Sequence, residues 1–512
     1  MKIDAVHRRA DHEPTKLLIL LCVSVPSFML SLDANIVAVS LPSIAHSLKA
    51  DFAAIEWVIS AYTLTFASLL LPAGTLADRY GRKNILLVGL AIFTVASFIC
   101  GAAPKVAVLN VARALQGVGA ALLLSAALAT LSHEFRGPAR AKAFAFWGSV
   151  IGIAITLGPV IGGSITQKFG WEWAFYINIP IGLAVFGLTT YAVRDSRDPD
   201  AKSVDVPGFL SFACALFLLT LALISGNHMG WGSFAVIAEF IVAVLLFGAF
   251  LVIEMKHERP MLDLGFFRRP TYIGANVAGF AYAAAFYTIL TYLPLYFQGG
   301  LGLAPQQVGL LMLPMALPLF IMPRLVSKYL THRLSGRGLL SLGLGLVGIG
   351  MFWLGLVAQE FRYLSMLAGM LIAGTGAGIL NGETAKVSMT VIPPERAGMA
   401  AGVGGTVRFS GIVIGFAALG AILFEKVMSS LSHLVPTISN SERIVITQRV
   451  AAGDLFDAVN LRQGSKEDAM VSFAAGYQAL FFAAGAFAIL SAVASWLLIR
   501  YSDTPPETSD PR

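Results

Sequence analysis

Two charged side chains stand inside stretches that are otherwise apolar. Asp33 lies within the apolar run 17–41, and Arg113 lies within the run 105–132. A charge at the centre of a bilayer costs about 2.5–3.5 kcal/mol on insertion scales, so such a residue faces a partner or a watery space. At 1.5 Å per residue, the two lie at similar depths if both runs are spanning helices. This placement predicts an ion pair or a shared hydrogen-bond network. It could exchange a proton, or it could be a fixed structural pair.

A second group of charges lies near the end of the chain. Glu383 and Lys386 are three residues apart and therefore share a helix face. Glu383 could bind a cationic substrate or a proton, and equally the two residues could neutralise each other. Arg408, inside the run 398–424, could balance Glu383 or bind an anionic group.

Aromatic side chains are concentrated in the run 271–297. Those near its middle are Phe280, Tyr282, Phe286 and Tyr287. Aromatic faces attract lipophilic cations, although such residues more often pack against other helices. Both interpretations stay open: these four side chains bind substrate in a cavity, or they are packing residues.

The composition excludes a soluble protein. Hydrophobic residues make up 57% and charged residues 13% of the chain, whereas soluble domains carry about 25% charged residues. A spanning helix needs about 20 mostly apolar residues, and a backbone in lipid must satisfy its own hydrogen bonds. The sequence therefore predicts an all-α, multi-pass protein of the inner (plasma) membrane with fourteen spans, near 17–41, 53–73, 84–103, 105–132, 141–165, 172–193, 206–226, 231–253, 271–297, 305–327, 338–358, 362–391, 398–424 and 473–499.

The positive charges predict which side of the membrane each loop faces. Most of the 36 Lys and Arg residues fall in the loops on one side, while the short loops on the other side hold only Lys49, Lys105, Lys168 and Arg362. Cytoplasmic loops are enriched in Lys and Arg, so both termini are expected to be cytoplasmic. The net charge of +7 thus describes topology, and we expect no nucleic-acid partner. We find no phosphate loop, metal-ligand cluster or nucleophile–base arrangement, so we expect no enzyme, cofactor or metal.

An internal repeat divides the chain. The segment LQGVGAALLLSAALATL (115–131) aligns with IAGTGAGILNGETAKVS (372–388), which places Gly117 on Gly374 and Gly119 on Gly376. We expect a six-helix bundle over 1–193, a linker and two inserted helices over 194–270, and a second six-helix bundle over 271–512. That second bundle would include a long outer loop at about 425–472. Duplicated bundles with a site between them are the usual plan of transporters.

Several motifs occur in order along the first 190 residues. In GTLADRYGRK (74–83), the glycines allow a tight turn. The positively charged residues around them hold the loop on the inner face of the membrane. Together with LDANIVAVSLPSI (32–44), LNVARALQGVGAA (109–121), GIAITLGPVIGG (152–163) and WEWAFYINIPIG (171–182), this motif resembles the major facilitator superfamily and its fourteen-span drug:proton antiporter family.

This resemblance implies roles for the motif residues. It implies two six-helix bundles plus two inserted helices, with proton coupling at Asp33 and Arg113. It also implies a conformational latch in the first loop, made by Gly74, Asp78, Arg79, Gly81, Arg82 and Lys83. The antiporter motif, which distinguishes exporters from importers, consists of Gly152, Gly158, Pro159, Gly162 and Gly163.

The expected function is proton-coupled export of lipophilic, cationic or amphipathic drugs or toxic compounds. The expected partners are a small-molecule substrate, protons and the lipid bilayer, and the resemblance leaves room for a periplasmic adaptor. Two alternatives remain: a proton-coupled importer or facilitator of a small nutrient, and a non-transporting membrane sensor or scaffold. The motif at 152–163 argues against the importer, and the short cytoplasmic loops argue against the sensor.

Overall fold

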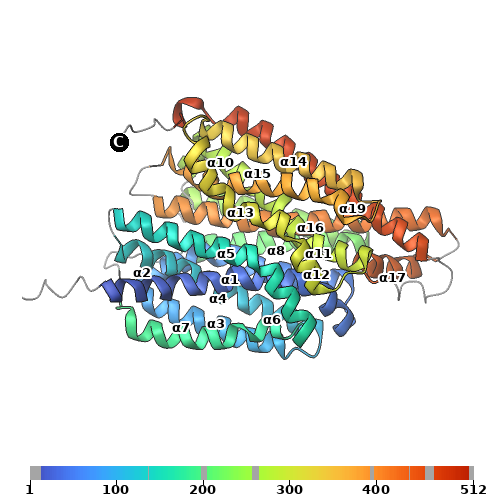
Figure 1. Cartoon of the computed structure of the whole chain (residues 1–512), viewed down its shortest axis with the longest axis horizontal. Helices are drawn as coiled ribbons and strands as arrows, with labels where there is room; N and C mark the ends of the chain where they lie inside the picture. Colours follow the sequence, from blue (N-terminus) through green and yellow to red (C-terminus); the bar gives the residue numbers. More distant parts are fainter. Residues whose placement is uncertain are drawn as a thin grey trace, which may run out of the picture.

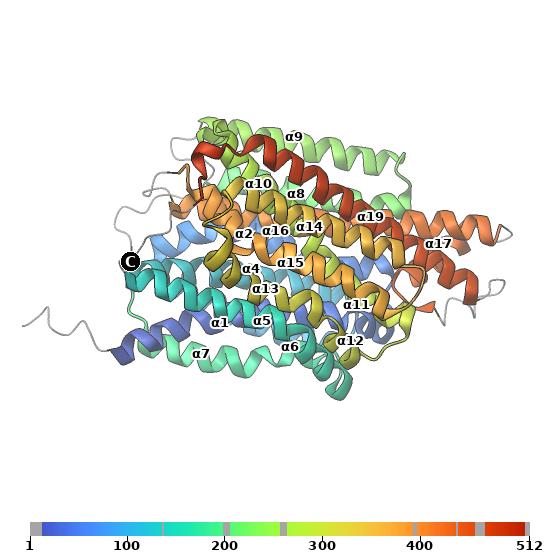
Figure 2. The same cartoon turned by 45° about the horizontal axis from the view of Figure 1, so that its top comes forward.

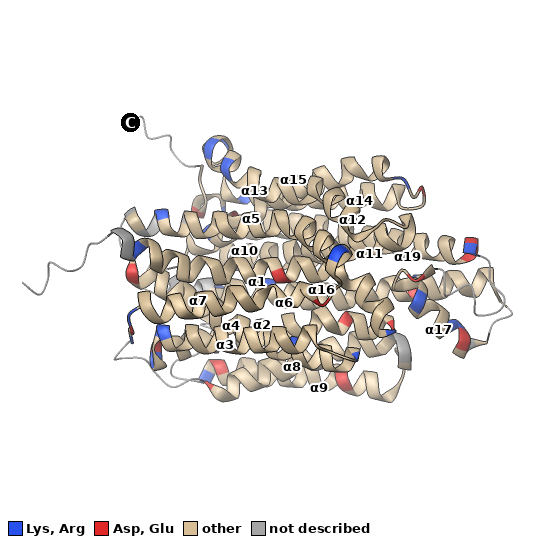
Figure 3. Ribbon diagram, turned by 60° about the horizontal axis from the view of Figure 1, so that its bottom comes forward, with Lys and Arg blue, Asp and Glu red and all other residues tan. Residues whose placement is uncertain are grey.

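The computed structural model describes residues 13–135, 138–197, 205–256, 264–392, 397–436, 439–455 and 466–506. Within these ranges it holds 14 helices long and apolar enough to cross a membrane, which confirms the predicted all-α fold and number of spans. The helices run roughly along the long axis of the molecule (Figure 1). Charged residues gather at the two ends of the bundle and are sparse along its middle (Figure 3).

The first six spans form the N-terminal half. They are α1 (Glu13–Leu48), α2 (Phe52–Tyr80), α3 (Arg82–Gly101), α4 (Val106–Glu134), α5 (Pro138–Phe169), and α6 (Trp173–Tyr176) followed by α7 (Asn178–Ala192). The inserted pair α8 (Val206–Met229) and α9 (Phe234–Lys256) follows. Only 17% of the apolar window of α9 is buried, so most of its side chains lie on the outer surface of the bundle. The predicted linker lies largely outside the described residues, at 198–204.

The last six spans form the C-terminal half, and two of them are interrupted. After the short η2 (Leu264–Arg268), the ninth span is α10 (Pro270–Tyr282), the π turn η3 (Ala283–Tyr287) and α11 (Thr288–Leu301). The tenth is α12 (Pro305–Leu311), α13 (Leu313–Leu325) and the π turn η4 (Val326–Leu330), with Pro318 and Pro323 inside α13. Proline removes a backbone donor and commonly marks such breaks. The others are α14 (Gly336–Val357), α15 (Tyr363–Met389), α16 (Ala397–Leu434) and α19 (Lys466–Leu498), followed by the short η6 (Tyr501–Asp503).

Much of the segment predicted as a long outer loop at about 425–472 is helical. The helix α16 continues to Leu434, α19 begins at Lys466, and α17 (Asn440–Ala451) lies between them. A capping box between Ser439 and Glu442 starts α17, because each side chain bonds a backbone N–H that the helix leaves unpaired. α17 lies at one end of the molecule, and α1 begins at the opposite end (Figure 2). We call these the α17 end and the Glu13 end.

The aligned glycines of the repeat make equivalent contacts in the two halves. A Cβ at Gly119 would lie 2.6 Å from the backbone nitrogen of Phe93, so α4 approaches α3 there. A Cβ at Gly376 would clash with the Gly343 carbonyl, so α15 approaches α14 in the same way. Close approach of two helix backbones requires small residues at the contact. The repeat in the sequence thus corresponds to a repeat in packing.

Candidate functional site

A cavity of about 1970 Å³ lies between the two halves. Residues of α1, α2, α4 and α5 line one side, and residues of the ninth, tenth, twelfth and thirteenth spans line the other. The lining includes Arg324, Ser327 and Lys328, which are exposed at the Glu13 end. The cavity therefore opens at the Glu13 end. Its volume exceeds the range of about 300–1,000 Å³ found for pockets of drug-sized ligands.

At the α17 end, the two halves touch directly. The side chain of Gln298 in α11 donates to the Val39 carbonyl of α1 at 2.8 Å. The backbone N–H of Gln306 in α12 donates to Oε1 of Gln167 in α5 at 3.2 Å. The structure is thus open at one end and closed at the other.

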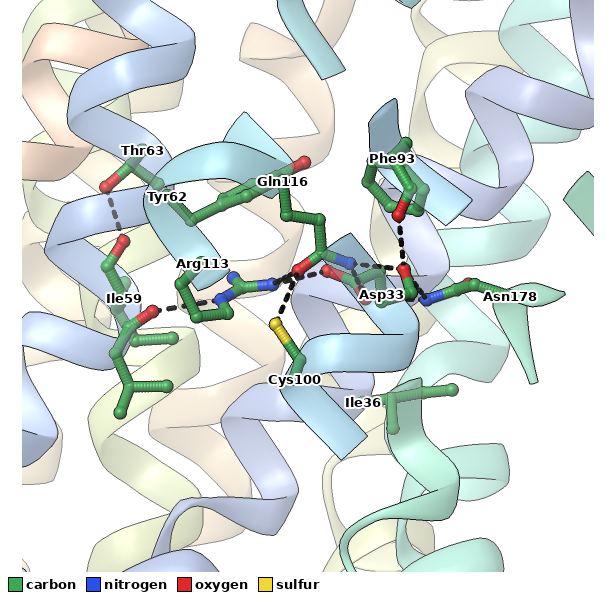
Figure 4. A network of polar contacts seen from close by, with 12 residues as sticks. Asp33, Ile36, Ile59, Tyr62, Thr63, Phe93, Cys100, Arg113, Gln116 and Asn178 are labelled. Carbon is green, nitrogen blue, oxygen red and sulfur yellow. Dashed lines mark hydrogen bonds and ion pairs between the residues drawn. The ribbon is translucent and has the colours of Figure 1, made fainter. Parts of the chain in front are cut away.

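Asp33 and Arg113 form a buried ion pair deep in the N-terminal half (Figure 4). The guanidinium Nη1 lies 2.8 Å from Oδ2 of Asp33, and both residues are 0% exposed. Oδ1 of Asp33 accepts hydrogen bonds from Gln116 at 3.0 Å and from Asn178 at 2.8 Å. The predicted ion pair is confirmed, and three donors compensate the buried carboxylate.

Arg113 connects this network to the wall of the cavity. Its Nε donates to the Val58 carbonyl at 3.0 Å, and its Nη1 donates to Oε1 of Gln116 at 2.6 Å. Its guanidinium lies 4.2 Å from the ring centre of Tyr62. Arg113 and Tyr62 line the cavity, whereas Asp33 is not among the lining residues. A change of charge at Asp33 would therefore reach the cavity through Arg113.

On the opposite wall, Arg408 of α16 meets Tyr287. Its Nη2 donates to the Tyr287 hydroxyl, and the guanidinium lies 4.8 Å from the Tyr287 ring centre. Both residues line the cavity. The Nε of Arg408 is buried without a hydrogen-bond partner, and no ion pair of Arg408 occurs in the described part of the chain. The wall of the cavity thus carries a positive charge that is not balanced by a neighbouring acid among the described residues.

The other residues predicted to contact substrate lie away from the cavity in this conformation. Tyr282 and Phe286 are buried and stack with ring centres 6.0 Å apart. Phe280 packs against Phe487 of α19, with ring centres 6.2 Å apart. None of these three lines the cavity, and their part in binding remains a prediction.

Glu383 also lies off the cavity wall. Its Oε1 is 3.7 Å from Nζ of Lys386, so the predicted alternative in which these two neutralise each other is observed as a contact. Among the described residues Arg408 contacts Tyr287, and a balance between Glu383 and Arg408 remains a prediction. A role for Glu383 in binding remains a prediction.

The helix α15 is broken beside Glu383. Asn381 has ψ 106° and Gly382 has φ 97°, which are not helical, and both residues line the cavity. Non-helical backbone at membrane depth is tolerated where it lines a cavity. This break was not predicted from the sequence. Its signal was the Asn-Gly dipeptide inside an apolar run, a pair that marks turns.

The loop predicted to be a latch is held by its own half. Gly81 has φ 101° and ends α2, a backbone conformation that glycine adopts without steric cost. Nη2 of Arg82 lies 3.0 Å from Oδ1 of Asp78, and the N–H of Arg82 donates to the Ser196 carbonyl at 3.0 Å. Lys83 donates to the Thr190 carbonyl at 2.7 Å. The bonds seen here stay within the N-terminal half and the segment directly after it, so a latch across the halves remains a prediction for another conformation.

The two remaining residues of this loop are placed differently. Gly74 lines the cavity, and a Cβ there would meet no atom within 4 Å in the described part of the chain. Arg79 is exposed, with its guanidinium 5.5 Å from the ring centre of Tyr80. Neither is required for packing in this conformation.

The glycines of the antiporter motif pack on two neighbours. A Cβ at Gly158 would lie 2.5 Å from Cβ of Asn35, and one at Gly162 would lie 2.8 Å from Cα of Ile36. This face of α5 therefore packs closely on α1, as the four-residue spacing predicts.

A second face of α5 meets the C-terminal half. A Cβ at Gly163 would clash with the Pro305 carbonyl, and the Pro159 carbonyl approaches Gly309 equally closely. A Cβ at Gly152 would lie 3.2 Å from Cδ2 of Phe320 in the tenth span. The motif therefore forms part of the closed seam at the α17 end, while its role in the direction of transport remains a prediction.

The structure adds three polar residues to the predicted site. Gln116 and Asn178 lie inside the motifs 109–121 and 171–182, but they are neutral, so the charge pattern of the sequence does not distinguish them. Glu56 was missed because it lies only four residues inside its apolar run, where a charge is expected to reach the surface. It is 1% exposed and contacts Tyr292 of the other half.

Two similar helical halves around a cavity that is open at one end, with a buried ionic network that reaches its wall through Arg113, define a secondary transporter. The sequence profile described as Major Facilitator Superfamily matches residues 23–416, and the chain belongs to this superfamily of transporters. The predicted family is thus confirmed.

Relatives in the same superfamily have names that refer to drug resistance and export. The chain is 34% identical to the multidrug resistance protein Stp of Mycobacterium tuberculosis (strain CDC 1551 / Oshkosh), over 88% of this chain and 83% of that one. It is 33% identical to the methylenomycin A resistance protein of Streptomyces coelicolor, over 77% and 83%. It is 30% identical to the tetracenomycin C resistance and export protein of Streptomyces glaucescens, over 92% and 90%.

Solved structures support the fold. A bacterial homologue of the human lysosomal transporter Spinster, in an inward-facing and unoccupied conformation, matches with a TM-score of 0.64 at 14% identity, over 98% of this chain and 100% of that one. The peptide transporter POT in complex with sulfate matches with a TM-score of 0.62 at 15% identity, over 94% of both chains. At these identities the likeness concerns the fold alone.

Proposed function

We propose that this protein exports lipophilic small molecules, cationic or amphipathic, from the cytoplasm in exchange for protons. The observation that carries the proposal is the buried Asp33–Arg113 network, which reaches the wall of a large cavity between two halves. The relatives named for drug resistance and export support the direction of transport and the class of substrate. The antiporter motif in α5, which forms part of the closed seam, agrees with an exporter.

We propose that the Glu13 end is cytoplasmic, with both termini on that side. Lys and Arg residues concentrate in the loops of that end, as expected for cytoplasmic loops. The structure would then be the inward-open state, with its cavity facing the cytoplasm. A periplasmic adaptor, if one is used, would meet the protein at the α17 end.

Proton exchange would act through the hydrogen bonds of Asp33. A proton on its carboxyl removes the counter-charge of Arg113 and weakens the bonds from Gln116 and Asn178. Arg113 would then turn its charge towards the cavity that it already lines. Release of the proton would restore the ion pair. Each charge that crosses the membrane gains about 2.3 kcal/mol per 100 mV, which can bias this cycle.

The polar contact for the substrate would be Arg408 with Tyr287, within a cavity whose remaining wall is largely apolar. An amphipathic compound would place its apolar body against that wall and its electron-rich or anionic group at Arg408. Glu383 would attract a cationic group when the α15 break moves it away from Lys386. Phe280, Tyr282 and Phe286 would contribute only if the ninth span rearranges during transport.

Purified protein in liposomes tests this proposal. The vesicles contain a pH-sensitive dye, and a lipophilic fluorescent compound such as ethidium is the substrate. We expect an imposed proton gradient to drive substrate in the direction opposite to the protons, and the substrate to move protons when no gradient is imposed. Substrate moving in the same direction as the protons would identify an importer. A transport rate that does not depend on the proton gradient would exclude proton coupling.

A further inference from the structure

A buried carboxyl joins the two halves at the closed α17 end. Glu56 lies in the second turn of α2 and is 1% exposed. The Tyr292 hydroxyl of α11 lies 3.1 Å from its Oε1. No ion pair of Glu56 occurs within the described ranges of the chain. Unlike Asp33, therefore, this acid has no cation paired with it among those residues to compensate a negative charge, and burial of an unpaired carboxylate is very costly.

The hydrogen bonds around Tyr292 indicate where a proton must be. Its hydroxyl lies 3.1 Å from Glu56 and 3.0 Å from the Phe416 carbonyl of α16. A carbonyl and a carboxylate only accept hydrogen bonds, and a tyrosine has one proton to donate. One contact would therefore be left without a proton if Glu56 were ionised. If Glu56 is protonated, it donates to Tyr292 and Tyr292 donates to Phe416, so both contacts are satisfied.

Helix α16, which packs against α2 and α11 at this point, leaves space for the Glu56 carboxyl. A Cβ at Gly420 of α16 would clash with Oε1 of Glu56. The ring of Tyr292 stacks on Phe416 with centres 4.4 Å apart at 16°. Helices α11 and α16 belong to the C-terminal half and α2 to the N-terminal half. The carboxyl is therefore enclosed only while the two halves are together at this end.

Other ionisable groups near Glu56 do not replace Tyr292 as its partner. Asp51, which caps the start of α2, is exposed and its Oδ1 accepts from the N–H of Ala54. On α16, Glu425 and Lys426 are exposed beyond Gly420. On α4, Arg113 faces Asp33. The charged residues of α17, which also touches α2, are Glu442, Arg443 and Arg449, and no ion pair of theirs with Glu56 is found in the described residues.

We propose that Glu56 is a second proton-binding site, and that a proton bound there stabilises the state that is closed at the α17 end. When this end opens, α2 separates from α11 and α16, water reaches the carboxyl and the proton leaves. The ionised carboxylate then opposes closure until it is protonated again. Because Glu56 does not line the cavity, this proton arrives and leaves on the α17 side and controls the gate without being carried across. The inference rests on the proposed function only in identifying that side as the outside.

Distance measurements by electron spin resonance test the proposal directly. Spin labels at Lys105 and Arg362, both at the α17 end on opposite halves, report the opening. Cys214 is replaced by serine, while Cys22 and Cys100 are buried and stay. We expect the ratio of open to closed molecules to rise with pH, by at most about tenfold per pH unit, because one proton is linked to closure. Glu56→Gln, whose amide can donate to Tyr292, should stay closed at every pH.

Two further variants keep the result decisive. Glu360→Gln removes an exposed acid at the same end, outside the contact between halves, and should keep the wild-type pH dependence. Tyr292→Phe retains the acid but removes its acceptor, so fewer molecules should close at low pH. If the labels in Glu56→Gln or Tyr292→Phe follow the wild-type pH curve, the proposal is overturned.

The experiments distinguish a failure of the Glu56 proposal from a failure of the proposed export function. If liposomes show proton-coupled export while Glu56→Gln still opens with pH as the wild type does, only the gate proposal fails. A gate that depends on Glu56, in a protein whose substrate flux ignores the proton gradient, would support the gate and reject proton-coupled export.

Discussion

The carboxylate of Asp33 and the guanidinium of Arg113 lie 2.8 Å apart on α1 and α4, and both side chains are buried. They are 80 residues apart in sequence, and Gln116 bonds to both. This arrangement satisfies a buried charge while leaving Arg113 at the cavity wall. It can therefore serve as a structural ion pair or as the coupling site, and variants can distinguish the two roles.

Replacing Asp33 by asparagine should abolish proton-driven export while the protein still inserts in the membrane. Loss of one partner of a buried pair also costs about 3–5 kcal/mol of stability. The double variant Asp33→Asn with Arg113→Gln removes both charges and should recover much of that stability. Thermal unfolding and dye efflux are measured for each. Export restored in the double variant would show that the pair is purely structural.

Arg408→Gln should weaken binding of compounds with an anionic or phenolate group by about 10- to 150-fold, because a hydrogen bond to a charged group contributes about 1.5–3 kcal/mol. Neutral lipophilic compounds should change much less. Equilibrium binding to the purified protein measures both. Arg408→Lys is the matched control, since it keeps the charge and loses the planar contact with Tyr287. An equal loss for charged and neutral ligands would argue for a packing role.

The pair Glu383–Lys386 gives opposite expectations for its two members. Glu383→Gln should reduce export of cationic more than neutral compounds, because it removes a negative charge beside the α15 break. Lys386→Gln should increase cation binding, since it removes a competing positive charge that lies 3.7 Å from the Glu383 carboxylate. A partly exposed ion pair contributes about 0.2–1 kcal/mol, so effects of a few fold are expected. Export assays with paired cationic and neutral dyes measure the difference, and equal losses for both would remove Glu383 from charge recognition.

Gly163→Ala should weaken closure at the α17 end. The added methyl group would clash with the Pro305 carbonyl across the seam between α5 and α12, and overpacking of this kind costs about 1–3 kcal/mol. The same spin-label distances should shift towards the open state. Gly187→Ala in α7, where a Cβ meets no atom of the described residues within 4 Å, is the control. Unchanged distances in Gly163→Ala would mean that the seam can relax without opening.

Gly81→Ala and Gly74→Ala separate the two glycines of the predicted latch. Gly81 has φ 101°, so alanine there should cost about 1–3 kcal/mol as backbone strain. Gly74 has open space around it, so alanine should be tolerated in the state seen here. Thermal stability and export are compared for both. If Gly74→Ala is stable but inactive, Gly74 is needed in a conformation in which the loop meets the other half, as a latch requires.

The fold could be predicted from the sequence because a lipid bilayer restricts which structures can cross it. Lipid demands long apolar helices, so the fourteen spans could be found from composition alone, and the motifs at 74–83 and 152–163 led to the family. The same constraint made Asp33 and Arg113 conspicuous, because isolated charges within apolar helices need partners. Helix ends were less certain: α16 and α19 extend into the predicted loop because polar residues can continue a helix beyond the membrane.

Only the tertiary structure decided which polar groups meet. Which face of a helix turns towards a partner depends on packing across distant segments, and periodicity within one segment does not specify it. The contact of Glu56 with Tyr292 spans 236 residues. Tyr287 lines the cavity and Tyr282 does not, although their hydroxyl groups lie 3.3 Å apart. Apolar content thus determined that the chain crosses the membrane. The way its helices pack determined where charge, water and substrate can meet.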